Sequence, residues 1–146
     1  MKLVIDASVA LKLIFDEGDS KLAVDVFAAA NSLAPELLKI ETGNRIARAV
    51  FSGEFSLSEG VLAQRTIENS IVRFYPDRNL LERAFLLSST LNHAIYDCIY
   101  LALAEQENAC LVTADGRFCR LLKEANFTSV KWLSIPECLD WITATP

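Results

Sequence analysis

Met1-Lys2-Leu3-Val4-Ile5-Asp6-Ala7-Ser8 is the stretch that decides the fold class. Its apolar Leu3-Val4-Ile5 run predicts a short strand that is buried on both faces of a parallel sheet. Asp6 ends this strand, and Ser8 with the apolar residues 9–15 opens a helix. Because ligands of open α/β sheets bind at the carboxyl ends of the strands, Asp6 is a candidate site residue.

The rest of the chain alternates predicted helices with short apolar segments. Helices are predicted over residues 21–30, 36–51, 57–69, 78–91, 95–106 and 115–122, and a last helix opens at residues 134–137. Later strands are predicted at residues 109–113 and 130–133, with 33–34 and 71–74 as ambiguous candidates. The alternation predicts an α/β fold with three or four short strands in a mostly parallel sheet.

Composition narrows the classes of protein that fit. The 146 residues are 52% hydrophobic, which predicts one densely packed domain over residues 1–146. A net charge of −5 argues against broad electrostatic binding of nucleic acid, but it permits a local basic rim or a bound metal. No apolar run reaches the roughly 18 residues of a membrane span, so no membrane association is expected.

Cysteine usage indicates the compartment. The four cysteines include no C-x-x-C pair, and with the single histidine, His93, they make a poor zinc ligand set. Reduced, mostly buried thiols in a cytoplasmic protein are the simplest interpretation.

Four carboxylates occupy positions where apolar or neutral residues are usual. Asp6 ends the first strand, and Asp115 follows the 109–113 strand in the same way. Asp97 lies in the first turn of the most apolar helix, and Glu41 lies on the 36–51 helix. Taken singly, the aspartates have ordinary explanations as helix caps or as first-turn acids that the helix dipole favours by roughly 0.3–1 kcal/mol.

Glu41 is harder to explain as a surface residue. Helical spacing from residue 37 places Glu41 and Asn44 on or beside the apolar stripe that should face the core. A buried glutamate costs several kcal/mol unless it is paired. The structural alternative is a buried ion pair with Arg45 or Arg48.

The four acids together favour a metal site. Carboxylates crowded at one sheet edge repel one another, which raises their pKa values, and a hard divalent cation removes that penalty. Mg²⁺ and Mn²⁺ prefer oxygen ligands. Such all-acid sites serve phosphodiester hydrolysis, in which the metal polarises the phosphoryl oxygen and activates water.

Four motifs carry a resemblance to a known family. They are Val4-Ile5-Asp6-Ala7-Ser8-Val9, Glu41-Thr42-x-Asn44, Tyr96-Asp97-x-x-Tyr100-Leu101-Ala102-Leu103-Ala104 and Leu111-Val112-Thr113-Ala114-Asp115-x-x-Phe118. In order, spacing and context, the chain resembles a PIN domain, and most closely the VapC type of toxin–antitoxin ribonuclease. The resemblance implies a three-layer α/β/α fold with a short, mostly parallel central sheet.

The resemblance also implies a site and partners. Asp6, Glu41, Asp97 and Asp115 would form the acidic pocket that binds Mg²⁺ or Mn²⁺. Ser8, Asn44 and Thr113 fall where the family has polar groups that support the acids or position substrate; capping, a buried amide hydrogen bond and strand propensity are their structural alternatives. The implied partners are an RNA substrate, a cognate antitoxin and a second copy of the chain.

We therefore expect a metal-dependent endoribonuclease, the toxin of a type II toxin–antitoxin pair, that cleaves structured or single-stranded RNA loops through metal-activated water. Two alternatives stay open. One is the same nuclease in RNA processing without an antitoxin, which the neighbouring gene would distinguish. The other is a non-catalytic module that binds protein or RNA, which predicts no dependence of stability on divalent ions.

The remaining polar residues have both a functional interpretation and an ordinary interpretation as surface or loop residues. His93 is expected to be a loop residue before the 95–106 helix rather than a ligand or general base. A basic rim for RNA phosphates is expected to use two or three of a larger set of cations. The set is Lys12, Lys39, Arg45, Arg48, Arg117, Arg120 and Lys123.

Overall fold

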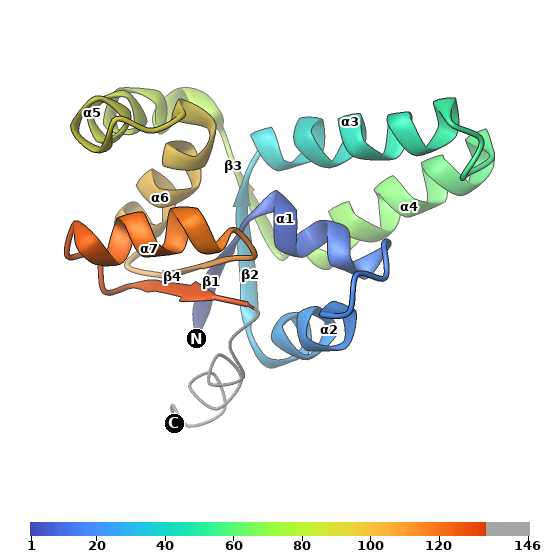
Figure 1. Ribbon diagram of the computed structural model, residues 1–146, viewed down its shortest axis with the longest axis horizontal. Coiled ribbons are helices and arrows are strands. Elements are labelled where there is room, and N and C mark those ends of the chain that lie inside the picture. Colours follow the sequence, from blue (N-terminus) through green and yellow to red (C-terminus); the bar gives the residue numbers. More distant parts are fainter. Residues whose placement is uncertain (134–146) are drawn as a thin grey trace.

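The computed structural model describes residues 1–133 (Figure 1). The predicted helix at residues 134–137 lies outside them. A five-stranded sheet, with all its strands parallel, has the order β3-β2-β1-β4-β5. The strands are β1 (Lys2–Ile5), β2 (Asn31–Pro35), β3 (Arg73–Tyr75), β4 (Cys110–Thr113) and β5 (Val130–Trp132). The expectation of three or four strands was thus too low: both ambiguous segments are strands, because β2 pairs with β1 and β3 pairs with β2.

The helices begin and end close to the predicted positions. They are α1 (Ala7–Ala10), α2 (Ser20–Ala29), α3 (Leu37–Phe51), α4 (Leu57–Ser70), α5 (Leu81–Leu91), α6 (Ile95–Glu107) and α7 (Gly116–Glu124), with 3₁₀ turns at Leu11–Leu13 and Asp77–Asn79. Ser56 caps α4 as predicted, since its Oγ accepts from the backbone N of Glu59 at 3.1 Å. The start of α5 is later than predicted, because Asp77 accepts from the backbone N of Leu37 at 3.0 Å and so serves α3 instead.

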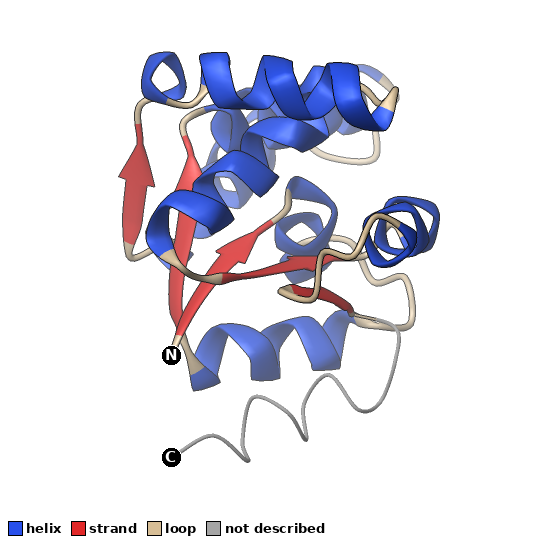
Figure 2. Ribbon diagram, turned by 90° about the vertical axis from the view of Figure 1, so that its left-hand side faces the viewer, coloured by secondary structure: helices blue, strands red, loops and turns tan. Residues whose placement is uncertain are grey.

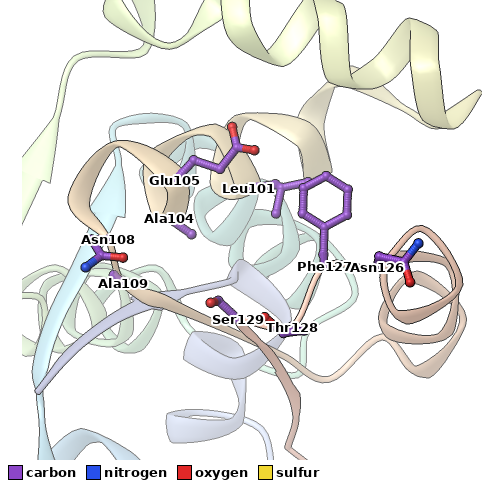
Figure 3. A pocket seen from close by; sticks show the side chains of 9 residues that line it. All are labelled: Leu101, Ala104, Glu105, Asn108, Ala109, Asn126, Phe127, Thr128 and Ser129. Carbon is purple, nitrogen blue, oxygen red and sulfur yellow. The ribbon is translucent and has the colours of Figure 1, made fainter.

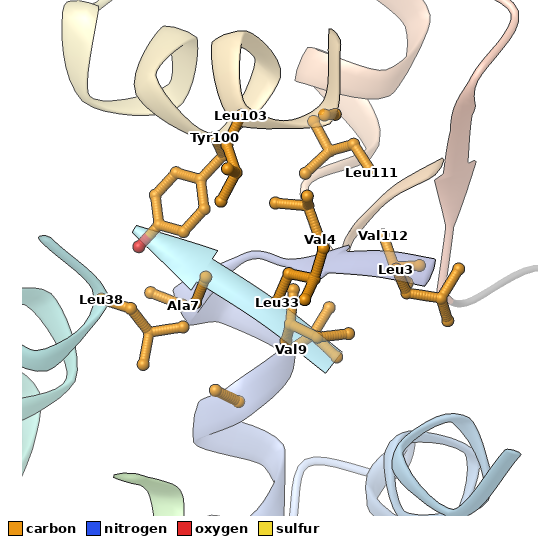
Figure 4. Packing of buried hydrophobic residues seen from close by; sticks show 14 of the residues in the cluster. Leu3, Val4, Ala7, Val9, Leu33, Leu38, Tyr100, Leu103, Leu111 and Val112 are labelled. Atoms are coloured by element: carbon orange, nitrogen blue, oxygen red, sulfur yellow. The ribbon is translucent and has the colours of Figure 1, made fainter. Parts of the chain in front are cut away.

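The core confirms the α/β/α expectation. Leu3, Val4 and Ile5 of β1 have no exposed surface, as a strand buried on both faces requires. Figure 4 shows Tyr100 and Leu103 of α6 on one side of the strands, with Val9 of α1 on the other. Figure 2 shows the strands enclosed between helices. No helix within residues 1–133 is long and apolar enough to cross a membrane.

Helix α3 is rotated relative to the prediction. Its buried side chains are Leu38, Thr42, Ile46 and Ala49, whereas Phe51, on the predicted stripe, is 84% exposed. Close packing of α4 decides the rotation, because a Cβ on Gly60 would lie 2.7 Å from the Val50 side chain. The rotation leaves Glu41 half-buried and Asn44 exposed, so the prediction that both face the core was wrong for Asn44.

The sheet order creates a position for a site. The chain runs outward from β1 to β3, then returns to the other side of β1 with β4 and β5. The direction of winding therefore changes between β1 and β4, and ligands of such sheets bind at the carboxyl ends of the strands at that point. Asp6 follows β1 and Asp115 follows β4, so both acids lie at this edge.

Candidate active site

Asp6 lies between β1 and β4, where the direction of winding of the sheet changes. Its backbone N donates to the carbonyl of Val112 at 3.1 Å, and it takes the cap position of α1. Its Oδ2 accepts two hydroxyl hydrogen bonds of 2.7 Å, one from Ser8 and one from Thr113. Residues of α1 and β4 thus fix this carboxylate, and Asp6 is only 9% exposed.

The two hydroxyl groups are themselves oriented by the loop after β4. Ser8 Oγ accepts from the backbone N of Ala114 at 3.0 Å, and Thr113 Oγ1 accepts from the backbone N of Asp115 at 3.0 Å. Because each hydroxyl oxygen accepts a backbone proton, each directs its own proton to Asp6. Ser8 and Thr113 therefore lie against the acid that the sequence singled out, and they link it to Asp115.

Burial is the main cause of a shift in the pKa of Asp6. Removal from water raises the pKa of this carboxyl, and the negative charge of Asp97 raises it further. The hydrogen bonds from Thr113 and Ser8 lower the pKa in part, without reversing the shift. Asp6 is a buried acid that the protein compensates with neutral donors.

Glu41 projects from α3 to the same place. The Tyr100 hydroxyl of α6 donates to its Oε2. Burial raises the pKa of Glu41, and the charges of Asp6 and Asp97 add to the shift. The alternative of an ion pair with Arg45 is wrong, because Arg45 lies over the Phe15 ring at 3.8 Å and 4.0 Å from Glu54.

Asp97 is held by a residue whose role the sequence did not reveal. Its Oδ2 lies 2.6 Å from Nε2 of His93. The His93 ring stacks on Phe118, with centroids 4.6 Å apart, and its backbone N donates to the carbonyl of Ser88 at 3.1 Å. His93 lies before α6 as predicted, but it is fixed in place; its spacing of four residues from Asp97 was the available signal.

Asp115 is a true helix cap. Its Oδ1 accepts from the backbone N atoms of Arg117 and Phe118 at 2.9 and 3.1 Å. The side chain is exposed, and it is absent from the causes that shift the pKa values of Asp6 and Glu41. The structure thus couples Asp6, Glu41 and Asp97 electrostatically, and it connects Asp115 to them through Thr113.

Within the described residues, neither lysine nor arginine neutralises these acids. Within residues 1–133, none of the four candidate carboxylates forms a salt bridge with lysine or arginine; His93 is the one partner of this kind. The donors are oxygens, which suit a hard divalent cation. In this part of the chain, however, no three ligand side chains stand close enough together to hold one ion without rearrangement.

Two cavities flank α6. One of about 400 Å³ lies beside the acids and is lined by His93, Asp115, Arg117 and Leu121. The other, of about 360 Å³, lies at the opposite end of the helix and contains none of the four acids (Figure 3). Its lining is Leu101, Ala104, Glu105, Asn108, Ala109, Asn126, Phe127, Thr128 and Ser129.

Known proteins share this sequence pattern and fold. The VapC ribonuclease Mb0985 of Mycobacterium bovis is 32% identical over 115 residues, which are 79% of this chain and 87% of the relative. Ribonuclease VapC12 of Mycobacterium tuberculosis is 30% identical over 118 residues, 81% of this chain and 90% of the relative. The crystal structure of PAE2754 from Pyrobaculum aerophilum shares the fold, with a TM-score of 0.69 and 18% identity over 99% of this chain and 91% of that chain.

The family model that describes the PIN domain matches residues 3–124, a range that includes β1, α3, α6 and the β4–α7 junction. All four candidate acids lie within the matched range. The chain belongs to the PIN domain family.

Proposed function

We propose that this chain is a single nuclease domain over residues 1–146, a metal-dependent endoribonuclease and the toxin of a type II toxin–antitoxin pair. One observation carries the proposal. Asp6, Glu41 and Asp97 lie at the carboxyl edge of the sheet, where burial and neighbouring acids raise the pKa values of Asp6 and Glu41, with no lysine or arginine in a salt bridge to them in the described part of the chain. The relatives named as ribonucleases favour RNA as the substrate.

The donor set fits Mg²⁺ or Mn²⁺. Asp6, Asp97 and Asp115 would hold the ion directly or through water, and Glu41 would orient water or hold a second ion. A bound divalent ion supplies charge for the phosphoryl oxygens and lowers the pKa of water. Because the acids do not yet stand at coordination distance, binding would draw their side chains together.

Neighbouring residues would keep the acids in position. Ser8 and Thr113 orient Asp6 through its Oδ2. His93 fixes Asp97, and the Tyr100 hydroxyl fixes Glu41. Such partners hold ligand side chains in productive rotamers, and their loss typically costs 10–100-fold in metal affinity or activity. Asn44, exposed on α3, would contact substrate rather than the acids.

An RNA cleavage assay tests the proposal. Wild-type protein should cleave single-stranded RNA with Mg²⁺ or Mn²⁺ and stop on addition of EDTA. Asp6→Asn should lose at least about 100-fold in rate, because the isosteric amide keeps both hydroxyl hydrogen bonds but removes a metal ligand. Glu105→Gln, which changes an equal charge at the other end of α6, should cleave normally. Equal cleavage by Asp6→Asn and wild type would reject the assignment.

Two exposed apolar surfaces support the proposed partners, an antitoxin and a second copy of the chain. A groove between α3 and α4 is bordered by Phe51 and Leu57, which are 84% and 73% exposed. On α5, Phe85 and Leu86 are 63% and 52% exposed. Apolar patches of this kind mark protein–protein interfaces.

Co-expression with the product of the adjacent gene tests partner binding. Phe51→Ser and Phe85→Ser would each be compared with wild type for recovery of the heterocomplex and for homodimer mass. We expect at least one of the two variants to lose the heterocomplex, and at least one of them to lose the homodimer. A gene neighbourhood without a small antitoxin frame would instead favour an RNA-processing nuclease. Buried Cys98 and Cys119 are free thiols, which supports a cytoplasmic location.

A further inference from the structure

The cavity lined by His93, Asp115, Arg117 and Leu121 adjoins the acids and shares His93 and Asp115 with their hydrogen-bond network. Its walls come from the loop before α6 and from the first turns of α7. His93 contacts Asp97, and Asp115 is linked to Asp6 through Thr113. A ligand in this cavity would therefore lie directly beside two of the proposed metal ligands.

Three of the seven cations expected to form a basic rim are engaged elsewhere. Lys12 is 8% exposed and pairs with Glu17 and Asp19. Lys39 pairs with Glu36 at 2.8 Å, and Arg45 lies 4.0 Å from Glu54. These side chains are held by carboxylates or aromatic rings on the surface, so they are poor choices for binding phosphate.

Arg117 differs from them in two respects. Its guanidinium group forms no salt bridge within residues 1–133, and the residue lines the cavity beside Asp115. Arg48 is equally exposed and equally without a salt bridge in that range, but it lines none of the cavities described above. The two arginines thus differ in location and not in charge.

The cavity wall is formed before any ligand arrives. The His93 ring is stacked on buried Phe118 and joined to Asp97, while its carbonyl accepts from Ser88 Oγ at 2.5 Å. Opposite charges and an apolar side chain line the same hollow, since Arg117 is accompanied by Asp115 and Leu121. A preformed wall lowers the entropic cost of binding.

We propose that this cavity is a subsite for one backbone phosphate and the adjoining ribose of the RNA strand, with Arg117 as the phosphate ligand. The inference rests on the proposed function, because it takes RNA to be the substrate that reaches the acids. A guanidinium group binds phosphate oxygens in a bidentate manner, which fixes direction as well as charge. Leu121 offers the ribose an apolar contact, and the phosphate that follows is delivered to the edge where Asp6 and Asp97 lie.

Binding measured without cleavage tests the subsite. The probe is a short fluorescent single-stranded RNA of mixed sequence, followed by anisotropy with Ca²⁺ in place of Mg²⁺ and again with EDTA. Arg117→Gln should weaken binding about tenfold and reduce the salt slope by about 0.7, the value for one lost phosphate contact on a single strand. Arg117→Lys should fall between the two, because it keeps the charge and loses the bidentate geometry.

Arg48→Gln is the matched control, with the same change of charge at an exposed side chain of α3, and it should bind RNA within twofold of wild type. Unchanged melting temperatures would show that each variant is folded. If Arg117→Gln and Arg48→Gln bind alike, the subsite is overturned, even if the protein cleaves RNA. If the protein does not cleave RNA yet loses binding only in Arg117→Gln, the subsite stands and the nuclease proposal fails.

Discussion

The two ends of helix α6 place acids in opposite electrostatic surroundings. Near its carboxyl end, Glu105 accepts two hydrogen bonds from Arg83, at 2.6 and 2.9 Å, and Glu107 pairs with Lys2 at 3.3 Å. Near its amino end, Asp97 meets His93 and shares its surroundings with other acids. The acids at the carboxyl end of α6 are therefore paired with lysine or arginine, whereas Asp97 at its amino end, like neighbouring Asp6 and Glu41, has no such salt bridge within residues 1–133.

The pKa shifts follow this difference. Hydrogen bonds from Gln106, Tyr75 and Lys2 lower the pKa of Glu107, whereas burial and neighbouring acids raise the pKa values of Asp6 and Glu41. Ionisation of Glu107 is favoured by folding, and ionisation of the clustered acids is opposed by it. The ionised forms of Asp6 and Glu41, clustered near the amino end of α6, therefore cost stability in the absence of a cation, which is typical of functional sites.

Divalent-ion binding should produce the largest effect. Mn²⁺ at about 100 times its dissociation constant should stabilise the wild-type protein by about 2.7 kcal/mol. For a chain of this size, that corresponds to a rise in melting temperature of roughly 5–10 °C. Asp97→Asn should lose most of the rise, and Glu105→Gln should keep it, as scanning calorimetry would show. An identical rise in Asp97→Asn would place the ion elsewhere.

Removal of the histidine should have the next largest effect. His93→Ala frees the Asp97 carboxylate, so RNA cleavage should fall about 10–100-fold, with a higher Mn²⁺ concentration at half-maximal rate. His93→Gln should retain more activity, because its amide Nε2 can also donate to Asp97. Metal titrations of the initial rate would measure both. Equal losses in the two variants would mean that the ring matters for packing on Phe118 alone.

Neutralising Asp6 should stabilise the metal-free protein while it abolishes activity. Because its pKa is raised on folding, the folded protein holds this proton more tightly than the unfolded chain. Its favourable contribution is complete below the unfolded value of 3.8 and is lost as the pH rises through the folded pKa. At pH 7.5 without metal, Asp6→Asn should therefore melt a few degrees higher than wild type, at roughly 2–4 °C per kcal/mol.

Acid conditions provide the control for this prediction. As the pH is lowered toward 4, the advantage of Asp6→Asn over wild type should shrink, since the wild-type carboxyl regains its proton. Thermal melts across this range would measure the difference directly. A variant that melts lower than wild type at neutral pH would contradict the account of Asp6 as an acid whose ionisation is opposed by folding.

The smallest effect should come from the carboxyl end of α6, where Glu105 is paired with Arg83. Glu105→Gln removes the ion pair with Arg83, whose side chain is 53% exposed, so it should cost only about 0.2–1 kcal/mol. The melting temperature should fall by about 1–3 °C at low salt, with a smaller difference at high salt because the pair is screened. A rise in stability would erase the distinction between the two ends of α6.

Sequence patterns located the elements and the acids well. Strand β1 with Asp6, α6 with Asp97 and the β4–α7 junction with Asp115 were predicted from short local runs, because hydrophobic periodicity and capping residues act over a few positions. The rotation of α3 was not predictable from its own residues, since two adjacent apolar stripes compete there. Contact between Gly60 of α4 and Val50 decided it, and that contact exposed Asn44.

The amino-acid sequence alone determined the α/β class, the order of the elements and the placement of Asp6 and Asp115 at strand ends. Only the tertiary structure decided which groups surround those acids: hydroxyls of Ser8 and Thr113 for Asp6, Tyr100 for Glu41, and His93 for Asp97. The physical reason is that backbone periodicity is local, whereas Tyr100 and Thr113 come from segments 59 and 107 positions away from the acids they contact, and even the nearby Ser8 and His93 have their rotamers fixed by packing. Packing of α6 and α3 against the sheet brings those segments together.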